Sequence, residues 1–193
     1  MKDKTLNALL IVLTVALTLA ATWWMDGRYD SASITSPRVA LSESATASAP
    51  APHVKLTKLN GQMVNLHDYA GKIVLLNFWA TWCTPCIAEW PQFIRLARAM
   101  PDDLVILAVS IDDDKGKIAP FMKRYAGEYQ EVANIALFHD ADKSVSQDLF
   151  QTVRVPETIV VTPEMTMARK VAGLGLVWDS EDTKTYLRSL KKN

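Results

Sequence analysis

Two long apolar runs constrain the fold of this 193-residue chain more than any other feature of its sequence. Residues 72–79, KIVLLNFW, and residues 104–111, LVILAVSI, contain almost no polar side chains. A strand with one face in water alternates apolar and polar residues, whereas a continuous run of this length is typical of a strand buried on both faces. A helix is expected between them, over about residues 83–100, so the two strands belong to a parallel core.

The remaining pattern extends this core in both directions. Asn60-Gly61 separates two short apolar-containing runs and is the strongest short signal for a hairpin. Further strands are expected at residues 134–138, 157–162 and 167–172, and further helices at 117–129, at 141–151 and after a cap at Asp179 or Ser180. The acidic run at 112–114 lacks the pattern of a calcium loop and is interpreted as a solvated turn. The order indicates an α/β domain with a central mixed sheet and helices on both faces.

The N-terminal segment predicts a membrane anchor. Residues 5–25 carry no charged side chain and are mostly apolar. At about 1.5 Å per residue, a helix of this length crosses a hydrocarbon core about 30 Å thick. Lys2 and Lys4 precede the run, which places the rest of the chain outside the cytoplasm. The alternative is a cleaved signal peptide, although the run contains no clean A-x-A site.

The chain is therefore expected to have three parts. Residues 26–52 are rich in Ser, Ala, Thr and Pro and contain few large apolar side chains, so burial cannot offset the entropy cost of ordering them. We interpret them as a flexible linker between the anchor, residues 1–25, and a single domain, residues 53–193. The 21 basic and 21 acidic side chains give a formal net charge of +0, which argues against nucleic acid as a partner.

The only two cysteines, Cys83 and Cys86, lie in WCTPC, between the first apolar strand and the helix. A zinc site needs four ligands, and the three histidines are scattered without ligand spacing. A purely structural disulfide is disfavoured, because closing so short a loop adds little stability. We therefore expect a redox-active pair that needs no cofactor.

The helix start favours thiol chemistry, because its unsatisfied N–H groups and about half a positive charge stabilise a thiolate. Cys83, at that terminus, is expected to be the exposed nucleophile. Cys86, one turn further along, is expected to be covered and to resolve the mixed disulfide.

The segment FWATWCTPCIAEWP resembles the thioredoxin superfamily, and within it the membrane-anchored, extracytoplasmic branch of TlpA, ResA and CcmG (DsbE) proteins. The similarity extends over residues 54–192, from the opening hairpin to the ending GLGLVWDSEDTKTYLRSL. It implies a thioredoxin fold with an N-terminal β-hairpin and an inserted βα element, preceded by one transmembrane helix. It also implies a single-pass protein of a bacterial inner membrane with its catalytic domain in the periplasm.

The resemblance also implies roles for single residues. Cys83 matches the attacking thiolate and Cys86 the resolving thiol. Glu89 matches the active-site acid of this branch, and Asn77 stands where thioredoxin itself has a buried Asp. A partly buried carboxylate could exchange a proton with a nearby thiol near neutral pH. The alternative for Glu89 is an acid that only stabilises the first turns of the helix.

A second segment, RVPET, is expected to face the cysteines. The resemblance makes Pro156 a cis-proline, which presents the backbone of Val155 to an extended client segment. Glu157 follows the proline as in CcmG proteins and either shapes the mouth of the site or is an exposed acid on an edge strand. The substrate surface is expected to include these residues together with Trp82, Thr84 and Pro85.

These features predict an extracytoplasmic thiol–disulfide oxidoreductase, in the first place a reductase of protein disulfides. Its potential is expected roughly between about −270 mV and about −180 mV, because Thr84-Pro85 lacks the His of strongly oxidising CPHC relatives. The resemblance implies re-reduction by a DsbD- or CcdA-type membrane carrier. The sequence leaves the client open between apocytochrome c haem-site cysteines, copper-site cysteines and another protein. The alternatives are a disulfide-forming oxidase, a peroxidase, whose P-x₃-T-x₂-C pattern does not precede Cys83, and a copper chaperone on the same fold.

Overall fold

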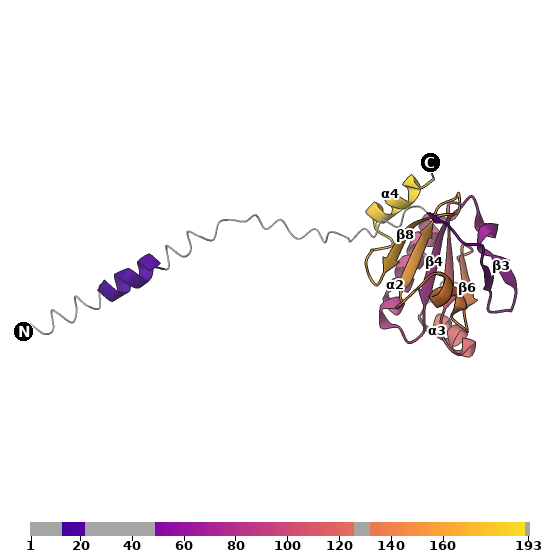
Figure 1. Cartoon of the computed structure of the whole chain (residues 1–193), viewed down its shortest axis with the longest axis horizontal. Coiled ribbons are helices and arrows are strands. Elements are labelled where there is room, and N and C mark those ends of the chain that lie inside the picture. Colours follow the sequence, from indigo (N-terminus) through magenta and orange to yellow (C-terminus); the bar gives the residue numbers. More distant parts are fainter. Residues whose placement is uncertain (1–12, 22–48, 126–131, 192–193) are drawn as a thin grey trace, which may run out of the picture. The chain divides into compact units, whose positions relative to one another are not determined.

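The computed structural model describes residues 13–21, 49–125 and 132–191 (Figure 1). The chain divides into two compact units, Met1–Ser44 and Ala45–Asn193. In the first unit residues 13–21 are helical. Within the described ranges, no helix has both the length and the apolar character needed to cross a membrane. The rest of the expected anchor, and residues 26–48 of the expected linker, lie outside the described residues.

The second unit is built on a six-stranded mixed sheet with the order β1-β8-β7-β4-β5-β6. The two apolar runs form its centre as β4 (Ile73–Trp79) and β5 (Leu104–Ser110), and every residue of both strands is buried. They pair in parallel from Ile73 opposite Leu104 to Trp79 opposite Ser110, and β6 (Ile135–His139) continues the parallel half. On the other side of β4, β7 (Glu157–Val161) pairs antiparallel with β4, and β8 (Thr166–Ala172) pairs antiparallel with β7, as expected for a mixed sheet.

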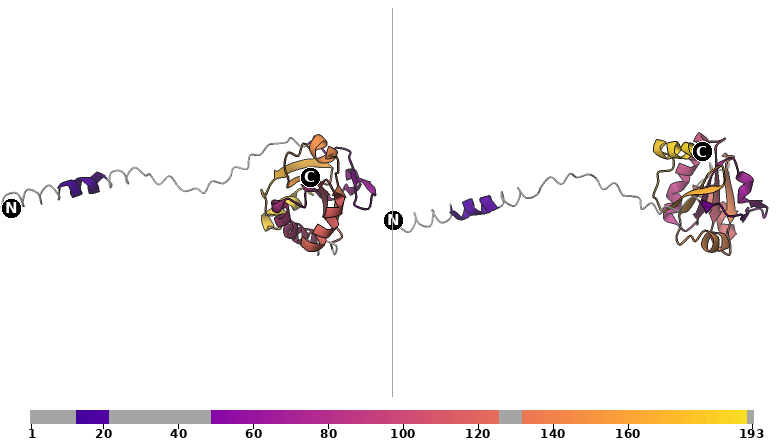
Figure 2. Two further views of the ribbon diagram at one scale, coloured as in Figure 1. Left: turned by 90° about the horizontal axis from the view of Figure 1, so that it is seen from below. Right: turned by 45° about the horizontal axis from the view of Figure 1, so that its top comes forward.

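The sheet carries a separate apolar core on each face, because successive side chains of a strand point in opposite directions. Ile73, Leu75 and Trp79 of β4 belong to one core, which contains side chains of α2 (Thr84–Ala99), α3 (Ile118–Tyr125) and α4 (Glu181–Ser189). Val74, Leu76 and Phe78 belong to the other core. The sheet is seen from two further directions in Figure 2.

The second face differs from the expectation of regular helices on both sides. It is covered by short elements: the hairpin β2 (Lys55–Thr57) and β3 (Met63–Asn65), the 3-10 turn η1 (Leu66–Tyr69) and the π-helical turn η4 (Ser144–Leu149). The α-helix predicted over 141–151 is thus replaced by η4. The Asp140 carboxylate accepts the N–H groups of Val145 and Ser146, and Phe150 N–H donates to the carbonyl of Val145, five residues back, which widens the turn.

The domain also begins earlier than the expected boundary at residue 53. Ala49 and Pro50 form strand β1, opposite Met167 and Thr166 at the edge of the sheet. The next residue, Ala51, is buried, and its N–H donates to Met165 O at 2.7 Å. An edge strand tolerates proline, since one row of its backbone groups needs no partner strand.

In the other half of the domain, 3-10 turn η2 (Lys115–Lys117) leads into α3, and the last residues of the predicted 117–129 helix lie outside the described residues.

Candidate active site

The cysteine pair lies where the central strand β4 gives way to α2. Cys83 is the N-cap of the helix, and its Sγ accepts the N–H of Cys86 at 3.3 Å. A disulfide joins Cys83 to Cys86, with 5.3 Å between their Cα atoms. Pro85 occupies the first turn, where a missing N–H costs nothing. Both sulfurs therefore lie at the positive end of a 16-residue helix.

The expected difference in exposure between the two cysteines is not present in this oxidised state. Cys83 is 4% exposed and Cys86 is 2% exposed, so the prediction of an exposed Cys83 is wrong here. The reason is the disulfide, which holds Sγ of Cys83 over the first turn of α2 beside the Cys86 N–H. The asymmetry that remains is positional: one sulfur caps the helix and the other lies inside it.

The loop between β4 and the helix is held by Asp112, which follows β5 on the neighbouring strand. Its carboxylate accepts the Thr81 N–H at 3.0 Å, the Thr81 hydroxyl at 2.7 Å and the Ser110 hydroxyl at 2.7 Å. Asp112 is 1% exposed, so the interpretation of residues 112–114 as a solvated turn is wrong for its first member. The register of the parallel strands brings this acid beneath the loop that leads into Cys83.

Glu89 is buried three residues after Cys86 on the same helix. It is 1% exposed, and the indole N–H of Trp178 donates to its Oε1 at 2.9 Å. Its other oxygen, Oε2, is buried and has no hydrogen-bond partner among the described residues. Burial raises the pKa of Glu89 from 4.5 to about 7, and the Trp178 hydrogen bond opposes that rise. Residues three apart are neighbours on a helix surface, so this carboxyl and Cys86 share one side of α2.

Two further buried polar groups surround the end of β4. Asn77 is 2% exposed and donates from Nδ2 to the Thr158 hydroxyl on β7 at 3.0 Å. The position that the resemblance compares with a buried Asp therefore holds a neutral, satisfied amide. Because Asn77 carries no carboxyl, Glu89 is the buried carboxyl that lies nearest in sequence to Cys83 and Cys86.

The peptide bond between Val155 and Pro156 is cis, as the resemblance implied. Strand β7 begins directly after it and pairs Glu157 with Phe78 of β4. Pro156 therefore lies at the end of the sheet where β4 finishes and the loop to Cys83 begins. Gly173 N–H donates to the carbonyl of Pro156 at 2.8 Å.

Glu157 is not the exposed edge-strand acid that was one of its two interpretations. It is 5% exposed, and β7 lies inside the sheet between β4 and β8. Its Oε2 accepts the Thr152 hydroxyl at 2.6 Å and pairs with Lys170 Nζ at 3.0 Å. Lys170 also donates to the carbonyls of Phe150 and Gln151, at 2.9 and 3.1 Å. Glu157 thus holds the segment before Pro156 in place through its hydrogen bond with Thr152.

The other residues of the expected substrate surface differ in accessibility. Trp82 is 66% exposed, and Thr84 and Pro85 are exposed beside it. Val155 is half-buried, whereas Pro156 and Glu157 are buried. Among the described residues no group of three or more His, Cys, Asp or Glu side chains could hold a metal ion.

Sequence reasoning missed the residues that support this site: Asp112, Thr158, Lys170 and Trp178. Each lies far along the chain from the group that it contacts, so no local pattern marks it. The only signal at Trp178 was the residue type itself, because an indole N–H can act as a donor to a buried carboxyl.

A mixed sheet whose central strand leads into a helix capped by a disulfide-bonded CxxC, beside a cis-proline, is the arrangement of thioredoxin-fold thiol–disulfide oxidoreductases. Solved structures agree. The thioredoxin domain of a thiol-disulfide oxidoreductase from Bacteroides vulgatus covers 75% of this chain and 97% of its own length, with a TM-score of 0.59 at 24% identity. The exposed lipoprotein thioredoxin of Streptococcus pneumoniae covers 74% of this chain and 100% of its own length, with a TM-score of 0.55 at 26% identity.

The sequence comparisons are more specific. Residues 47–170 match the AhpC/TSA family. The thiol-disulfide oxidoreductase ResA of Bacillus subtilis is 33% identical over 132 residues, which is 68% of this chain and 70% of that protein. The chain belongs to the AhpC/TSA family, and within it to the ResA-type thiol-disulfide oxidoreductases.

Proposed function

We propose that this protein reduces disulfides of client proteins outside the cytoplasm. The observation that carries the proposal is the Cys83-Cys86 pair at the start of α2 together with the buried Glu89 carboxyl, one helical turn further along. The pair supplies two electrons, and the carboxyl, whose pKa is raised to about 7 by burial, exchanges a proton at neutral pH.

The reaction runs in two exchanges. The Cys83 thiolate attacks one sulfur of the client disulfide, which forms a mixed disulfide and releases the first client sulfur as a thiolate. Glu89 takes the proton of the Cys86 thiol, and the Cys86 thiolate attacks Sγ of Cys83. This step forms the Cys83-Cys86 disulfide and releases the second client sulfur. The client gains two electrons, and the pair loses two.

The exposed Trp82, Thr84 and Pro85 give a client access beside the buried sulfurs, and the Val155-Pro156 segment lies at the same edge of the sheet. An extended client segment that pairs with the backbone before Pro156 would present its disulfide to Cys83. We propose these residues as the client-binding surface, with Glu157 acting beneath it.

The working direction follows from the absence of a stabilising His between the cysteines, which favours reduction over disulfide formation. An enzyme that donates electrons outside the cytoplasm must be re-reduced, and the family resemblance supports a DsbD- or CcdA-type membrane carrier. Residues 5–25 support an inner-membrane anchor with the domain in the periplasm. Cysteine pairs of apocytochromes c or of copper sites are the client classes that we propose.

The test is reduction of a model disulfide, such as insulin, by the wild type and by matched cysteine variants. Wild type should turn over with a dithiol donor, Cys83→Ser should be inactive, and Cys86→Ser should accumulate mixed disulfides that a reductant releases. Ser189→Ala, which removes an exposed hydroxyl at the end of α4, is the control and should keep the wild-type rate. Equal mixed-disulfide yields from the Cys83→Ser and Cys86→Ser variants would contradict the assigned order of attack.

A further inference from the structure

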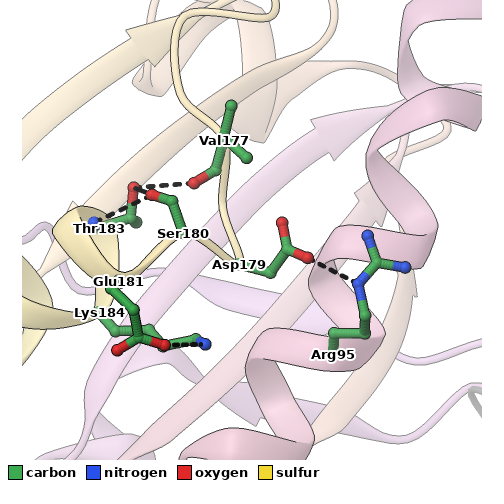
Figure 3. A network of polar contacts seen from close by, with 7 residues as sticks. All are labelled: Arg95, Val177, Asp179, Ser180, Glu181, Thr183 and Lys184. Atoms are coloured by element: carbon green, nitrogen blue, oxygen red, sulfur yellow. Dashed lines mark hydrogen bonds and ion pairs between the residues drawn. The ribbon is translucent and has the colours of Figure 1, made fainter.

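The segment that leads into α4 is fastened to α2 by three polar contacts in a row. The indole N–H of Trp178 donates to Glu89 Oε1 at 2.9 Å, and its backbone N–H donates to Gln92 Oε1 at 2.8 Å. The next residue, Asp179, pairs with Arg95 Nε at 2.6 Å, as Figure 3 shows. The three residues of α2 are spaced by three, so the row continues the side of the helix on which Cys86 lies.

Trp178 has little freedom to leave this position. It is 0% exposed, and its ring packs on Phe93 with 5.3 Å between ring centroids. Beyond it, Ser180 caps α4 by accepting the Thr183 N–H at 3.2 Å, and the Thr183 hydroxyl donates to the carbonyl of Val177 at 2.9 Å (Figure 3). The indole N–H is therefore held in place from both sides along the chain.

The chemistry of the indole makes this contact directional. An indole N–H is a donor only, so Glu89 Oε1 must act as an acceptor in both protonation states of the carboxyl. The carbonyl oxygen of a neutral carboxyl is a better acceptor than its hydroxyl oxygen, so a proton that Glu89 gains is favoured on Oε2, the buried oxygen that has no partner among the described residues. The two oxygens of one carboxyl are in this way given different tasks.

We propose that Trp178 is a positioning residue for proton transfer: its indole N–H occupies Oε1 of Glu89, so that Oε2 alone exchanges the proton with the Cys86 thiol. The relevance to turnover rests on the proposed function. The orientation of the carboxyl by Trp178 does not, because it can be measured in the oxidised protein, in which neither cysteine titrates.

The contact also sets how readily Glu89 ionises. A hydrogen bond to the charged form lowers the pKa of an acid, so loss of the indole N–H should raise the pKa of Glu89 above about 7. The ionisable groups nearby are Cys83 and Cys86 on α2, joined in the disulfide, and Arg95 and Asp179, paired with each other. The pKa of Glu89 responds to burial and to Trp178 rather than to a neighbouring charge.

The experiment is a carbon-13 NMR titration of the Glu89 side-chain carboxyl in the oxidised full-length protein. Trp178→Phe keeps an aromatic ring against Phe93 and removes the N–H. In this variant the midpoint of the Glu89 titration should rise by about one pH unit relative to wild type. Trp79→Phe is the matched control, since Trp79 is also buried and its Nε1 has no hydrogen-bond partner among the described residues. This control should keep the wild-type midpoint.

An unchanged midpoint in Trp178→Phe, or an equal shift in Trp79→Phe, would overturn the proposal. If Trp178→Phe does not fold, 3-benzothienylalanine at position 178 keeps the shape of the indole and replaces its N–H with sulfur, and the same rise is expected. Reductase rates against pH are then measured on the same variants. A raised midpoint with an unmoved rate profile would retain Trp178 as the group that orients Glu89 and would reject Glu89 as the proton carrier of the proposed function.

Discussion

Glu89 and Trp178 are separated by 89 residues in the sequence, and the Trp178 indole nitrogen lies 2.9 Å from the Glu89 carboxyl oxygen. The contact joins the helix that carries the cysteines to the C-terminal segment of the domain. It also satisfies only half of a buried carboxyl. A carboxyl in this setting is neutral over a wider pH range than an exposed one, which has consequences for stability as well as for thiol chemistry.

The stability of the oxidised protein should depend on the ionisation of Glu89. Its pKa in the folded protein is about 7, above its ordinary value of 4.5. A raised pKa means that the folded state holds the proton more tightly, so this stabilisation is present below pH 4.5 and is lost as the pH rises through about 7. The free energy of unfolding of wild type should therefore fall by about 3 kcal/mol over that interval because of Glu89. Glu89→Gln should not show this fall.

Urea unfolding of the two oxidised proteins at several pH values measures this difference. Asp182→Asn is the control, because Asp182 is an exposed acid on α4. Wild-type and Glu89→Gln curves that stay parallel from pH 4.5 to 8 would show that the Glu89 carboxyl does not ionise with a raised pKa.

Asp112 should be required for the conformation of the loop before Cys83. Asp112→Asn replaces one accepting oxygen with a donor, so at least one of its bonds to Thr81 and Ser110 is lost in a buried site. We expect a loss of about 2 kcal/mol in the free energy of unfolding and a slower reductase rate. The neighbouring Asp113→Asn is a matched control, since the side chain of Asp113 is 87% exposed and pairs with Lys143 at the surface. Equal effects of the two variants would contradict the role of Asp112.

Lys170 should hold the segment before Pro156. Lys170→Met leaves the Glu157 carboxylate buried without its cation and frees the carbonyls of Phe150 and Gln151. We expect the free energy of unfolding to fall by about 2 kcal/mol, which is less than for a fully buried pair because Lys170 is partly exposed. Adding Glu157→Gln should recover part of it. Lys184→Met, which breaks a pair with the exposed Glu181 three residues earlier on α4, should cost less than Lys170→Met. A double variant no more stable than Lys170→Met would contradict this account.

The apolar runs explain why so much of the fold could be predicted. Continuous burial on both faces is written into the composition of residues 72–79 and 104–111, and these became the paired strands β4 and β5. The cap at Ser180 and the hairpin at Asn60-Gly61 are equally local signals. In each case the residues that determine the element lie within it.

The remaining features depend on contacts between distant segments. Strand β1 has two residues and no periodicity, so only its pairing with β8 reveals it. The burial of Glu157 depends on Lys170, on the adjacent strand. The burial of Cys83 in the oxidised protein accompanies its disulfide with Cys86, a bond that the sequence pattern does not show. None of these can be obtained from local propensity.

The membrane topology predicted from residues 5–25 can be checked with reporter fusions. A reporter that is active only outside the cytoplasm should be active when fused after residue 30, and the mature protein should keep its original N-terminus. A mature chain that begins near Ala21 would show that the segment is a cleaved signal peptide, and it would leave the cysteine chemistry unchanged.

The most direct test of the account is the thiolate absorbance of the reduced protein against pH, measured for wild type, Glu89→Gln and Asp182→Asn. If Glu89 exchanges a proton with the cysteines, the three groups titrate as a coupled set, so the quantity compared is the whole curve. The account predicts that Glu89→Gln changes the curve near pH 7 and slows turnover, whereas Asp182→Asn matches wild type in both. A Glu89→Gln protein with the wild-type curve and the wild-type rate would contradict it, and another group would then have to carry the proton.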